Sequence, residues 1–224
     1  MTDHKDKPTT REKAVRVKTA RRRTSSSTKW LQRQLNDPYV HEAQRLGYRS
    51  RAAFKILQIH EKVNLFHKGQ VVVDLGSAPG GWSQIAAAHK VKKIIAIDLL
   101  PVDPIPGVDF VQMDFMADEA PDLLKSMTGG LVDLVMSDLA PNTSGHRETD
   151  HLRIMGLVEA AYDFATEILK PDGCFVAKVF QGGAQSDVLA RMKRDFKTVR
   201  HIKPPASRKD SAEQFVVAMG FRGR

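Results

Sequence analysis

The sequence contains one cysteine, Cys174, and no apolar stretch approaching the ~20 residues needed to cross a bilayer. A single cysteine excludes a disulfide framework and the cysteine-rich zinc patterns. The charged N-terminus is not followed by an apolar segment, which excludes a secretory signal. The eight histidines show no metal-ligand spacing, so we expect no metal site. These absences favour a globular protein of the reducing cytoplasm, with no membrane partner.

Positive charge is concentrated at the N-terminus. Residues 1–30 contain ten lysines and arginines against three acidic residues, a net charge of +7 out of +9 for the whole chain. Residues 1–28 also lack hydrophobic periodicity and end in a serine-rich run. We therefore predict a basic, disordered arm over 1–29 and a folded domain over 30–224. Such arms commonly bind nucleic acid, although a tail that only aids solubility has the same composition.

Apolar strands alternate with helical segments from residue 71 onward. The length of 224 residues suits one domain, which we expect to act as a monomer. We predict strands at 71–75, 94–98, 108–115, 131–138, 174–180, 198–202 and 214–220. We predict helices at 50–63, 82–90, 118–126, 150–169 and 184–196, the first with Ser50 as its N-cap. This alternation predicts an α/β fold with a mostly parallel sheet covered on both faces.

Acidic residues stand at the ends of three successive predicted strands. The first strand runs into the turn 74–82, the second ends at Asp98 and the third at Asp114. Open parallel sheets bind ligands at the carboxyl ends of their strands, and glycines in the turn allow a close approach. Asp98 lies 22 residues past Gly76, where an acid can bind a ribose diol. Asp114, one strand further along, would lie near an adenine amino group.

The glycine-rich turn departs from the dinucleotide fingerprint Gly-x-Gly-x-x-Gly. Ala78 and the rigid Pro79 replace the open pyrophosphate cradle. The turn therefore favours a nucleoside with a charged, phosphate-free tail, as in a methyl donor, over NAD. A structural turn, with acids that only cap the following helices, is the alternative at this point.

Several segments resemble the FtsJ/RrmJ methyltransferase family. They are 74–84, 97–101, 137–142 and 178–181, together with 50–55, 207–208 and 211–213. The resemblance covers the chain from about residue 30 to its end. It implies a Rossmann-like, S-adenosylmethionine-dependent fold, with a seven-stranded sheet and an antiparallel last strand. The family's bacterial type methylates a uridine 2′-hydroxyl of large-subunit ribosomal RNA, and we expect this to occur late in ribosome assembly.

The resemblance also implies the site residues. The family's Lys-Asp-Lys-Glu catalytic tetrad falls on Lys55, Asp138, Lys178 and Glu213. A packing role at the start of a helix is the simpler alternative for one predicted donor contact, Trp82. The residues implied to contact the methyl donor are Gly80, Trp82, Asp98, Asp114 and Asp138.

The residue types of the tetrad suit ribose chemistry. Lys178 stands in an otherwise apolar segment, where desolvation and a second cation, Lys55, would both lower its pKa. Neutral Lys178 would accept the proton of a ribose hydroxyl, a poor nucleophile at neutral pH, while Asp138 and Glu213 orient the lysines. The structural alternatives are a simple Lys178–Asp138 pair, a solvated Lys55 and an edge-strand Glu213.

Three classes of function remain open. An RNA ribose 2′-O-methyltransferase is favoured, acting on ribosomal RNA, with transfer RNA or a messenger cap as alternative substrates. A non-catalytic RNA-binding assembly factor on the same fold has no need of a buried lysine. A nicotinamide oxidoreductase is opposed by the turn after the first strand.

Overall fold

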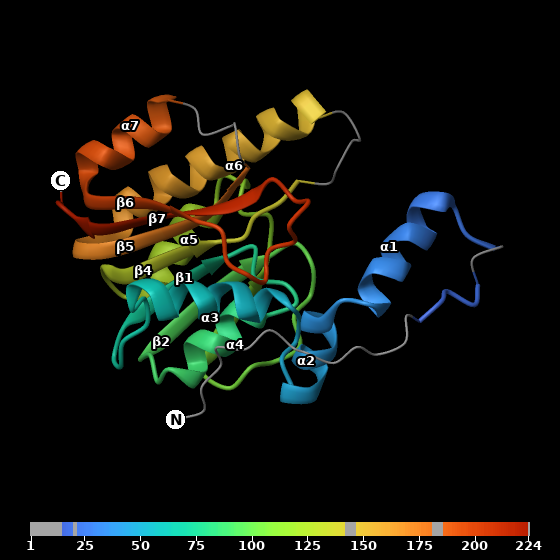
Figure 1. Cartoon of the computed structure of the whole chain (residues 1–224). Coiled ribbons are helices and arrows are strands. Elements are labelled where there is room, and N and C mark those ends of the chain that lie inside the picture. Colours follow the sequence, from blue (N-terminus) through green and yellow to red (C-terminus); the bar gives the residue numbers. More distant parts are fainter. Residues whose placement is uncertain (1–14, 20–21, 142–146, 181–185, 224) are drawn as a thin grey trace.

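The computed structural model describes residues 15–19, 22–141, 147–180 and 186–223, and within them a seven-stranded sheet forms the centre (Figure 1). The strands follow the order β3-β2-β1-β4-β5-β7-β6. Only β7 runs antiparallel, to both β5 and β6, and the other paired strands are parallel. The predicted fold class, including the antiparallel last strand, is confirmed. The strands are β1 Val71–Leu75, β2 Lys93–Asp98, β3 Val108–Gln112, β4 Val132–Ser137, β5 Leu169–Phe180, β6 Phe196–Ile202 and β7 Glu213–Phe221.

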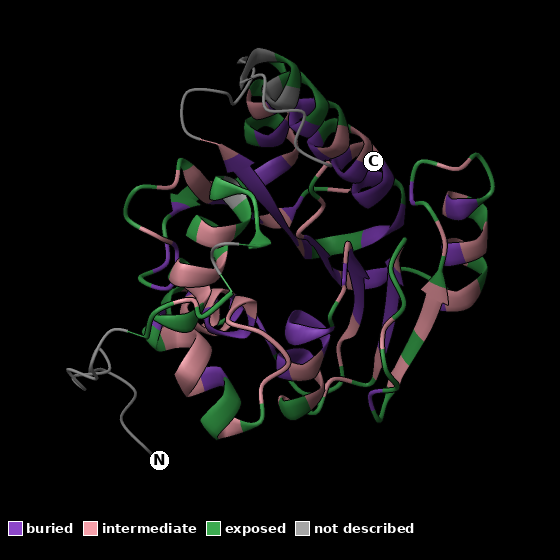
Figure 2. Ribbon diagram, turned by 90° about the vertical axis from the view of Figure 1, so that its right-hand side faces the viewer, coloured by how far each residue is buried: buried purple, intermediate pink, exposed green. Residues whose placement is uncertain are grey.

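Helices cover both faces of the sheet. Side chains alternate between the faces of a strand, so each buried strand contributes to two apolar clusters. One cluster packs under α3 (Ala52–Val63) and α4 (Gly81–Ala88). The other packs under α5 (Ala120–Thr128), α6 (Arg147–Ile168) and α7 (Ser186–Asp195). Figure 2 shows the resulting buried sheet between more exposed helices. Among the described residues, no helix is both long and apolar enough to span a membrane.

The predicted elements occur with shifts of up to three residues at their ends, except that β5 begins at Leu169, five residues before its predicted start at residue 174. The third strand stops at Gln112, short of residue 115, because Asp114 Oδ1 accepts a hydrogen bond from Met116 N at 2.9 Å and turns the chain. Helix α3 starts at Ala52, so Ser50 is not its N-cap. The Ser50 hydroxyl nevertheless accepts a hydrogen bond from Ala52 N at 3.2 Å, which satisfies one donor of the first turn.

Two helices that were not predicted precede α3, namely α1 (Ser25–Leu35) and α2 (Pro38–Leu46). Thr24 caps α1 by accepting a hydrogen bond from Ser27 N at 3.2 Å, so the serine-rich run forms the first helical turn. Val15 N donates to Asn36 Oδ1 at 2.7 Å, which attaches the preceding segment to the end of α1. Residues 25–29, which were assigned to the basic arm, therefore belong to α1. Residues 1–14 lie outside the described residues.

The turn after β1 passes very close to the turn after β4. Gly76 has φ +77°, and a Cβ atom there would lie 2.9 Å from Leu139 N and 3.1 Å from the Asp138 carbonyl carbon. Both obstacles are backbone atoms, which cannot rotate away. Glycine is therefore required where these two strand ends meet.

We predict that Gly76→Ala destabilises the fold by about 1–3 kcal/mol, because it adds a left-handed penalty to a backbone clash. Urea unfolding would measure the loss. Gly107→Ala is the matched control, since Gly107 has φ +80° but no atom of the described residues within 4 Å of its Cβ position. An equal loss in both variants would show that the close approach adds nothing.

Candidate active site

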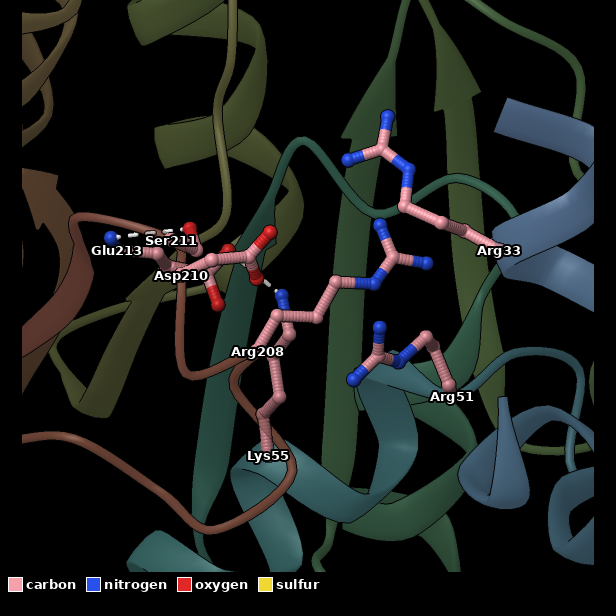
Figure 3. Close-up of a pocket in the computed structure, with 7 residues that line it drawn as sticks. All are labelled: Arg33, Arg51, Lys55, Arg208, Asp210, Ser211 and Glu213. Carbon is pink, nitrogen blue, oxygen red and sulfur yellow. Dashed lines mark hydrogen bonds and ion pairs between the residues drawn. The ribbon is translucent and has the colours of Figure 1, made fainter. Parts of the chain in front are cut away.

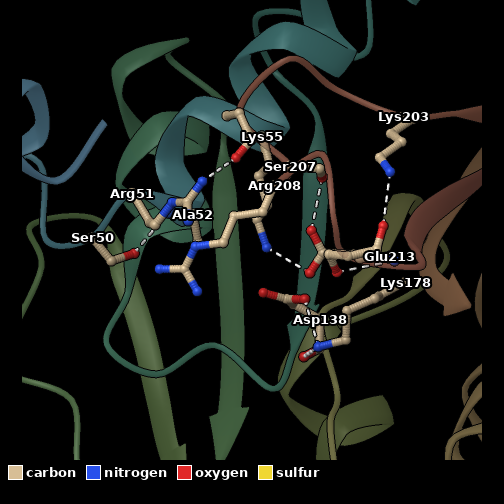
Figure 4. A network of polar contacts seen from close by, with 12 residues as sticks. Ser50, Arg51, Ala52, Lys55, Asp138, Lys178, Lys203, Ser207, Arg208 and Glu213 are labelled. Atoms are coloured by element: carbon tan, nitrogen blue, oxygen red, sulfur yellow. Dashed lines mark hydrogen bonds and ion pairs between the residues drawn. The ribbon is translucent and has the colours of Figure 1, made fainter. Parts of the chain in front are cut away.

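The predicted tetrad assembles at one end of the sheet, on the face covered by α3. Asp138 follows β4, Lys178 lies near the end of β5, and Glu213 opens β7. In each of these three strands, the residue two positions away from the tetrad residue packs in the apolar cluster beneath α3 and α4. The two-residue period of a strand therefore directs all three side chains to that face. Lys55 reaches them from α3 itself, as Figure 4 shows.

Two ion pairs hold the four residues. Lys178 Nζ lies 2.9 Å from Asp138 Oδ1 and donates to the Asp138 carbonyl oxygen at 2.8 Å. Lys55 Nζ donates to Glu213 Oε2 at 2.7 Å. The second oxygen of Glu213 accepts a hydrogen bond from Ser207 Oγ at 2.8 Å. Each lysine is thus fixed by an acid, and Lys55 is not the solvated helix lysine considered as an alternative.

The four charged side chains of this arrangement are largely removed from water. Lys178 is only 7% exposed, and the side chains of Lys55 and Glu213 are each 14% exposed. Charges withdrawn from water at this depth need close partners, and removing one partner leaves the other costly. Lys55 Nζ also lies 5.7 Å from the centre of the Phe215 ring. The pairs therefore fix the positions of two amino groups at the strand ends.

The turn after β1 is tied to the end of β2 by Asp98. Its carboxylate accepts hydrogen bonds from Ala78 N and Leu100 N, both at 2.8 Å. Gly80, with φ +101°, is buried, and a Cβ atom there would lie 2.7 Å from Ile105 Cδ1. Asp114 is exposed at the end of β3. The predicted donor residues therefore line the carboxyl ends of adjacent strands.

Trp82, predicted to contact the methyl donor, has its side chain packed in the core. Its side chain is 2% exposed, its Nε1 donates to Ala52 O at 3.1 Å, and its ring packs 5.5 Å from that of Phe215. These contacts commit the side chain to the core. Any contact of Trp82 with a bound donor must come from its main chain, at the start of α4.

Asp74 and Ser77 were missed as site residues. Asp74 is fully buried and accepts a hydrogen bond from Ser83 Oγ at 2.6 Å through Oδ2, but Oδ1 has no hydrogen-bond partner among the described residues. Ser77 Oγ likewise finds no partner in the described part of the chain. Burial, reinforced by the charges of Asp138 and Asp98 and opposed by the Ser83 hydrogen bond, raises the pKa of Asp74 to about 7.

These residues fit a nucleoside with a cationic tail. An unpartnered buried carboxylate oxygen is costly, and a cationic group beside it would offset that cost. Near Asp98 and Asp114, apolar side chains face solvent: Leu99 is 62% exposed, Leu100 64% and Met116 53%. Such a surface suits the flat face of a base. The same strand-end position that singled out Asp98 and Asp114 was the available signal for Asp74.

The chain matches the FtsJ-like methyltransferase family over residues 48–221. It belongs to that family. It is 60% identical over 214 residues to the Ribosomal RNA large subunit methyltransferase E of Xanthobacter autotrophicus, covering 93% of this chain and 84% of that protein. It is 59% identical over 222 residues to the protein of that name from a Bradyrhizobium species, covering 97% and 96%. A crystal structure of a ribosomal RNA methyltransferase from Plasmodium falciparum superposes with a TM-score of 0.69 at 28% identity, covering 79% of this chain and all of that one.

These matches confirm the family predicted from the motifs. They also confirm the predicted activity, that of an RNA methyltransferase. The roles of individual residues stay predictions. Asn142 and Gln181, each at the end of one of the matching motifs, lie outside the described residues.

The raised pKa of Asp74 predicts a pH-dependent stability. The folded state holds a proton that the unfolded state releases near pH 4, so stability should fall as the pH rises from about 4 to about 7. For one proton, the free energy of unfolding should fall by at most about 1.4 kcal/mol per pH unit. We expect Asp74→Asn to remove this decline in chemical denaturation followed across that range.

The control is Asp122→Asn, because the Asp122 side chain is 90% exposed and its loss leaves the buried site intact. Its pH profile should follow that of the unaltered chain. If Asp74→Asn and Asp122→Asn give the same profile, Asp74 does not hold its proton in the folded state.

Proposed function

We propose that this methyltransferase transfers a methyl group from S-adenosylmethionine to the 2′-hydroxyl of a uridine in large-subunit ribosomal RNA. The observation that carries the proposal is the buried Lys178–Asp138 pair, at the strand ends and beside Lys55–Glu213. The ribosomal substrate is supported by relatives near 60% identity that are named for the large-subunit RNA. We place the reaction late in assembly and in the cytoplasm, and expect a monomer to perform it.

The donor, when bound, supplies an electrophilic methyl group. Asp98 would bind its ribose diol, and Asp114 would bind the adenine amino group. The unpartnered Oδ1 of Asp74 and the carboxylate of Asp138 would bind its cationic tail. Gly80 allows the turn to pack closely against Ile105 in a left-handed conformation, and the main-chain N–H of Trp82 at the start of α4 would be a hydrogen-bond donor for the ligand.

We assign Lys178 as the general base that accepts the proton of the 2′-hydroxyl. In its uncharged form, Nζ accepts the proton of the 2′-hydroxyl as the oxygen attacks the methyl group. Asp138 holds that nitrogen in place from two directions, through its carboxylate and its main-chain oxygen. Orientation of the hydroxyl in line with the methyl group supplies much of the remaining rate.

Lys55 and Glu213 position the substrate ribose. Glu213 is held by Lys55 on one oxygen and by Ser207 on the other, which leaves little rotational freedom for the carboxylate. A fixed pair of this kind can hydrogen-bond the ribose without moving. The alternative substrate is transfer RNA, and the alternative role is that of a non-catalytic RNA-binding assembly factor. The buried tetrad disfavours the second, because RNA binding alone does not need it.

The donor site can be tested through Asp98. We expect Asp98→Ala to weaken S-adenosylmethionine binding by about 1.5–3 kcal/mol, through loss of a charge-assisted hydrogen bond. Isothermal titration calorimetry would measure the affinity. Because Asp98 also binds Ala78 N and Leu100 N, Asp98→Asn provides a milder comparison. Unchanged affinity in both variants would place the donor elsewhere.

The function itself can be tested with ribosomal subunits from cells that lack the enzyme. The unaltered chain should transfer one radiolabelled methyl group per large subunit, which nucleotide mapping should locate on a uridine 2′-oxygen. Lys178→Ala should lose most of this turnover, with donor affinity nearly unchanged, because Lys178 acts in the chemical step.

A pH profile of single-turnover rates gives a second readout. The rate of the unaltered enzyme should depend on pH through the group that accepts the hydroxyl proton, and the residual rate of Lys178→Ala should lack that dependence. Near-normal turnover in Lys178→Ala would refute its role as base. Methylation of transfer RNA alone would refute the substrate assignment but leave the chemistry in place.

A further inference from the structure

Two cavities beside the tetrad are lined by arginines from separate segments of the chain. The smaller, of about 260 Å³, lies next to Lys55 and Glu213 (Figure 3). The larger, of about 890 Å³, extends along α1 and the loop between β6 and β7. Both are lined by Arg33, Arg51 and Arg208, so they form one groove that leads from the tetrad to α1.

One buried carboxylate holds two of these arginines in place. Asp37, only 8% exposed, has Oδ2 at 2.6 Å from Arg51 Nη1 and at 3.3 Å from Arg208 Nη2. Arg208 Nη2 also donates to Gln34 Oε1 at 3.1 Å, and Arg51 donates to the Ala206 carbonyl oxygen. The two guanidinium groups are therefore fixed before any ligand arrives, which lowers the cost of binding one.

The groove has an excess of positive charge. Its inner cavity is lined by four cationic and two acidic side chains, and one of these acids, Glu213, is already paired with Lys55. The other, Asp210, is exposed. Burial lowers the pKa of Arg51, Asp37 raises it, and the neighbouring Arg208 lowers it again, which shows how closely the cations crowd. Asp37 offsets part of that repulsion, and a bound anion would offset more of it.

We propose that Arg33, Arg51 and Arg208 bind a phosphodiester of the RNA strand next to the target ribose, and that the groove along α1 takes the nucleotides that follow. This inference rests on the proposed function, since it names the part of the substrate held beside the tetrad. Guanidinium groups match phosphate oxygens in a two-bond geometry that lysine does not offer. Lys29 and Lys209 line the outer groove, where they can contact further phosphates.

Asp37 is a positioning residue in this arrangement. It is buried and determines where two of the arginines point. Replacing it distinguishes a positioning role from a purely electrostatic one, because Asp37→Asn deletes a negative charge from the groove wall. Simple electrostatic attraction then predicts tighter RNA binding, whereas loss of positioning predicts weaker binding.

The experiment measures RNA affinity by fluorescence anisotropy across a salt series, with a labelled oligouridylate of about 12 nucleotides as the probe. Arg33→Gln and Arg208→Gln should each lower the slope of log K against log salt by about 0.7, the value for one lost contact to a single strand. Arg222→Gln is the matched control, because Arg222 is exposed just past the far end of β7 from Glu213. Its slope should match that of the unaltered chain.

Asp37→Asn should bind the probe more weakly than the unaltered chain, with a melting temperature measured alongside. If its fold is disturbed, the two arginine variants still decide the question. Slopes for Arg33→Gln and Arg208→Gln that match Arg222→Gln would overturn the proposal, and so would tighter binding by a folded Asp37→Asn. S-adenosylmethionine affinity should be the same in the three arginine variants.

The two proposals fail separately. If ribosomal subunits receive no methyl group from the unaltered chain but the salt slopes change as expected, the substrate assignment fails and the phosphate site stands. If the subunits are methylated normally and the slopes stay parallel, the function stands and the phosphate site is refuted.

Discussion

The pairing of Lys178 with Asp138 is the constraint on which the rest of the site depends. A lysine at 7% exposure needs a close partner, and the partner must come from the neighbouring strand end. The parallel pairing of β4 and β5, with Ser137 opposite Ala177, puts Asp138 beside Lys178. That same edge is where the turn after β1 passes close to the turn after β4 at Gly76. The Lys178–Asp138 pair therefore lies directly beside the turn after β1.

The antiparallel β7 has a role that a parallel strand would not fill. Because it runs against β5, its first residue, Glu213, lies opposite Phe180 at the edge where the parallel strands end. The ten-residue loop between β6 and β7 brings Ser207 and Arg208 to the same edge. The last two strands thus deliver an acid, a hydroxyl and a cation to the site. The fold thus places the groups that we propose to face the substrate on this side, and those that we propose to face the donor beside β1 to β3.

Much of this arrangement was predictable from the sequence, for physical reasons. Acids at the ends of apolar strands, and a lysine inside one, are conspicuous because burial penalises them. Asp37 and α1 gave no such signal, because Asp37 lies in a polar segment and its partners, Arg51 and Arg208, are distant in sequence. Trp82 was ambiguous for a different reason: a motif identifies the residue but not whether its ring or its main chain faces the ligand.

The N-terminal segment differs from the rest of the fold in how it is held. In α1, Trp30 is 51% exposed and Leu35 38%, so little of its apolar surface is buried. Its contact with the loop before β7 is polar, a hydrogen bond from Arg208 to the side chain of Gln34. Elements with few buried apolar contacts unfold locally at a lower free-energy cost than a core strand does. A helix held this way can adjust to an RNA strand, while the tetrad behind it, fixed by buried pairs, keeps its geometry.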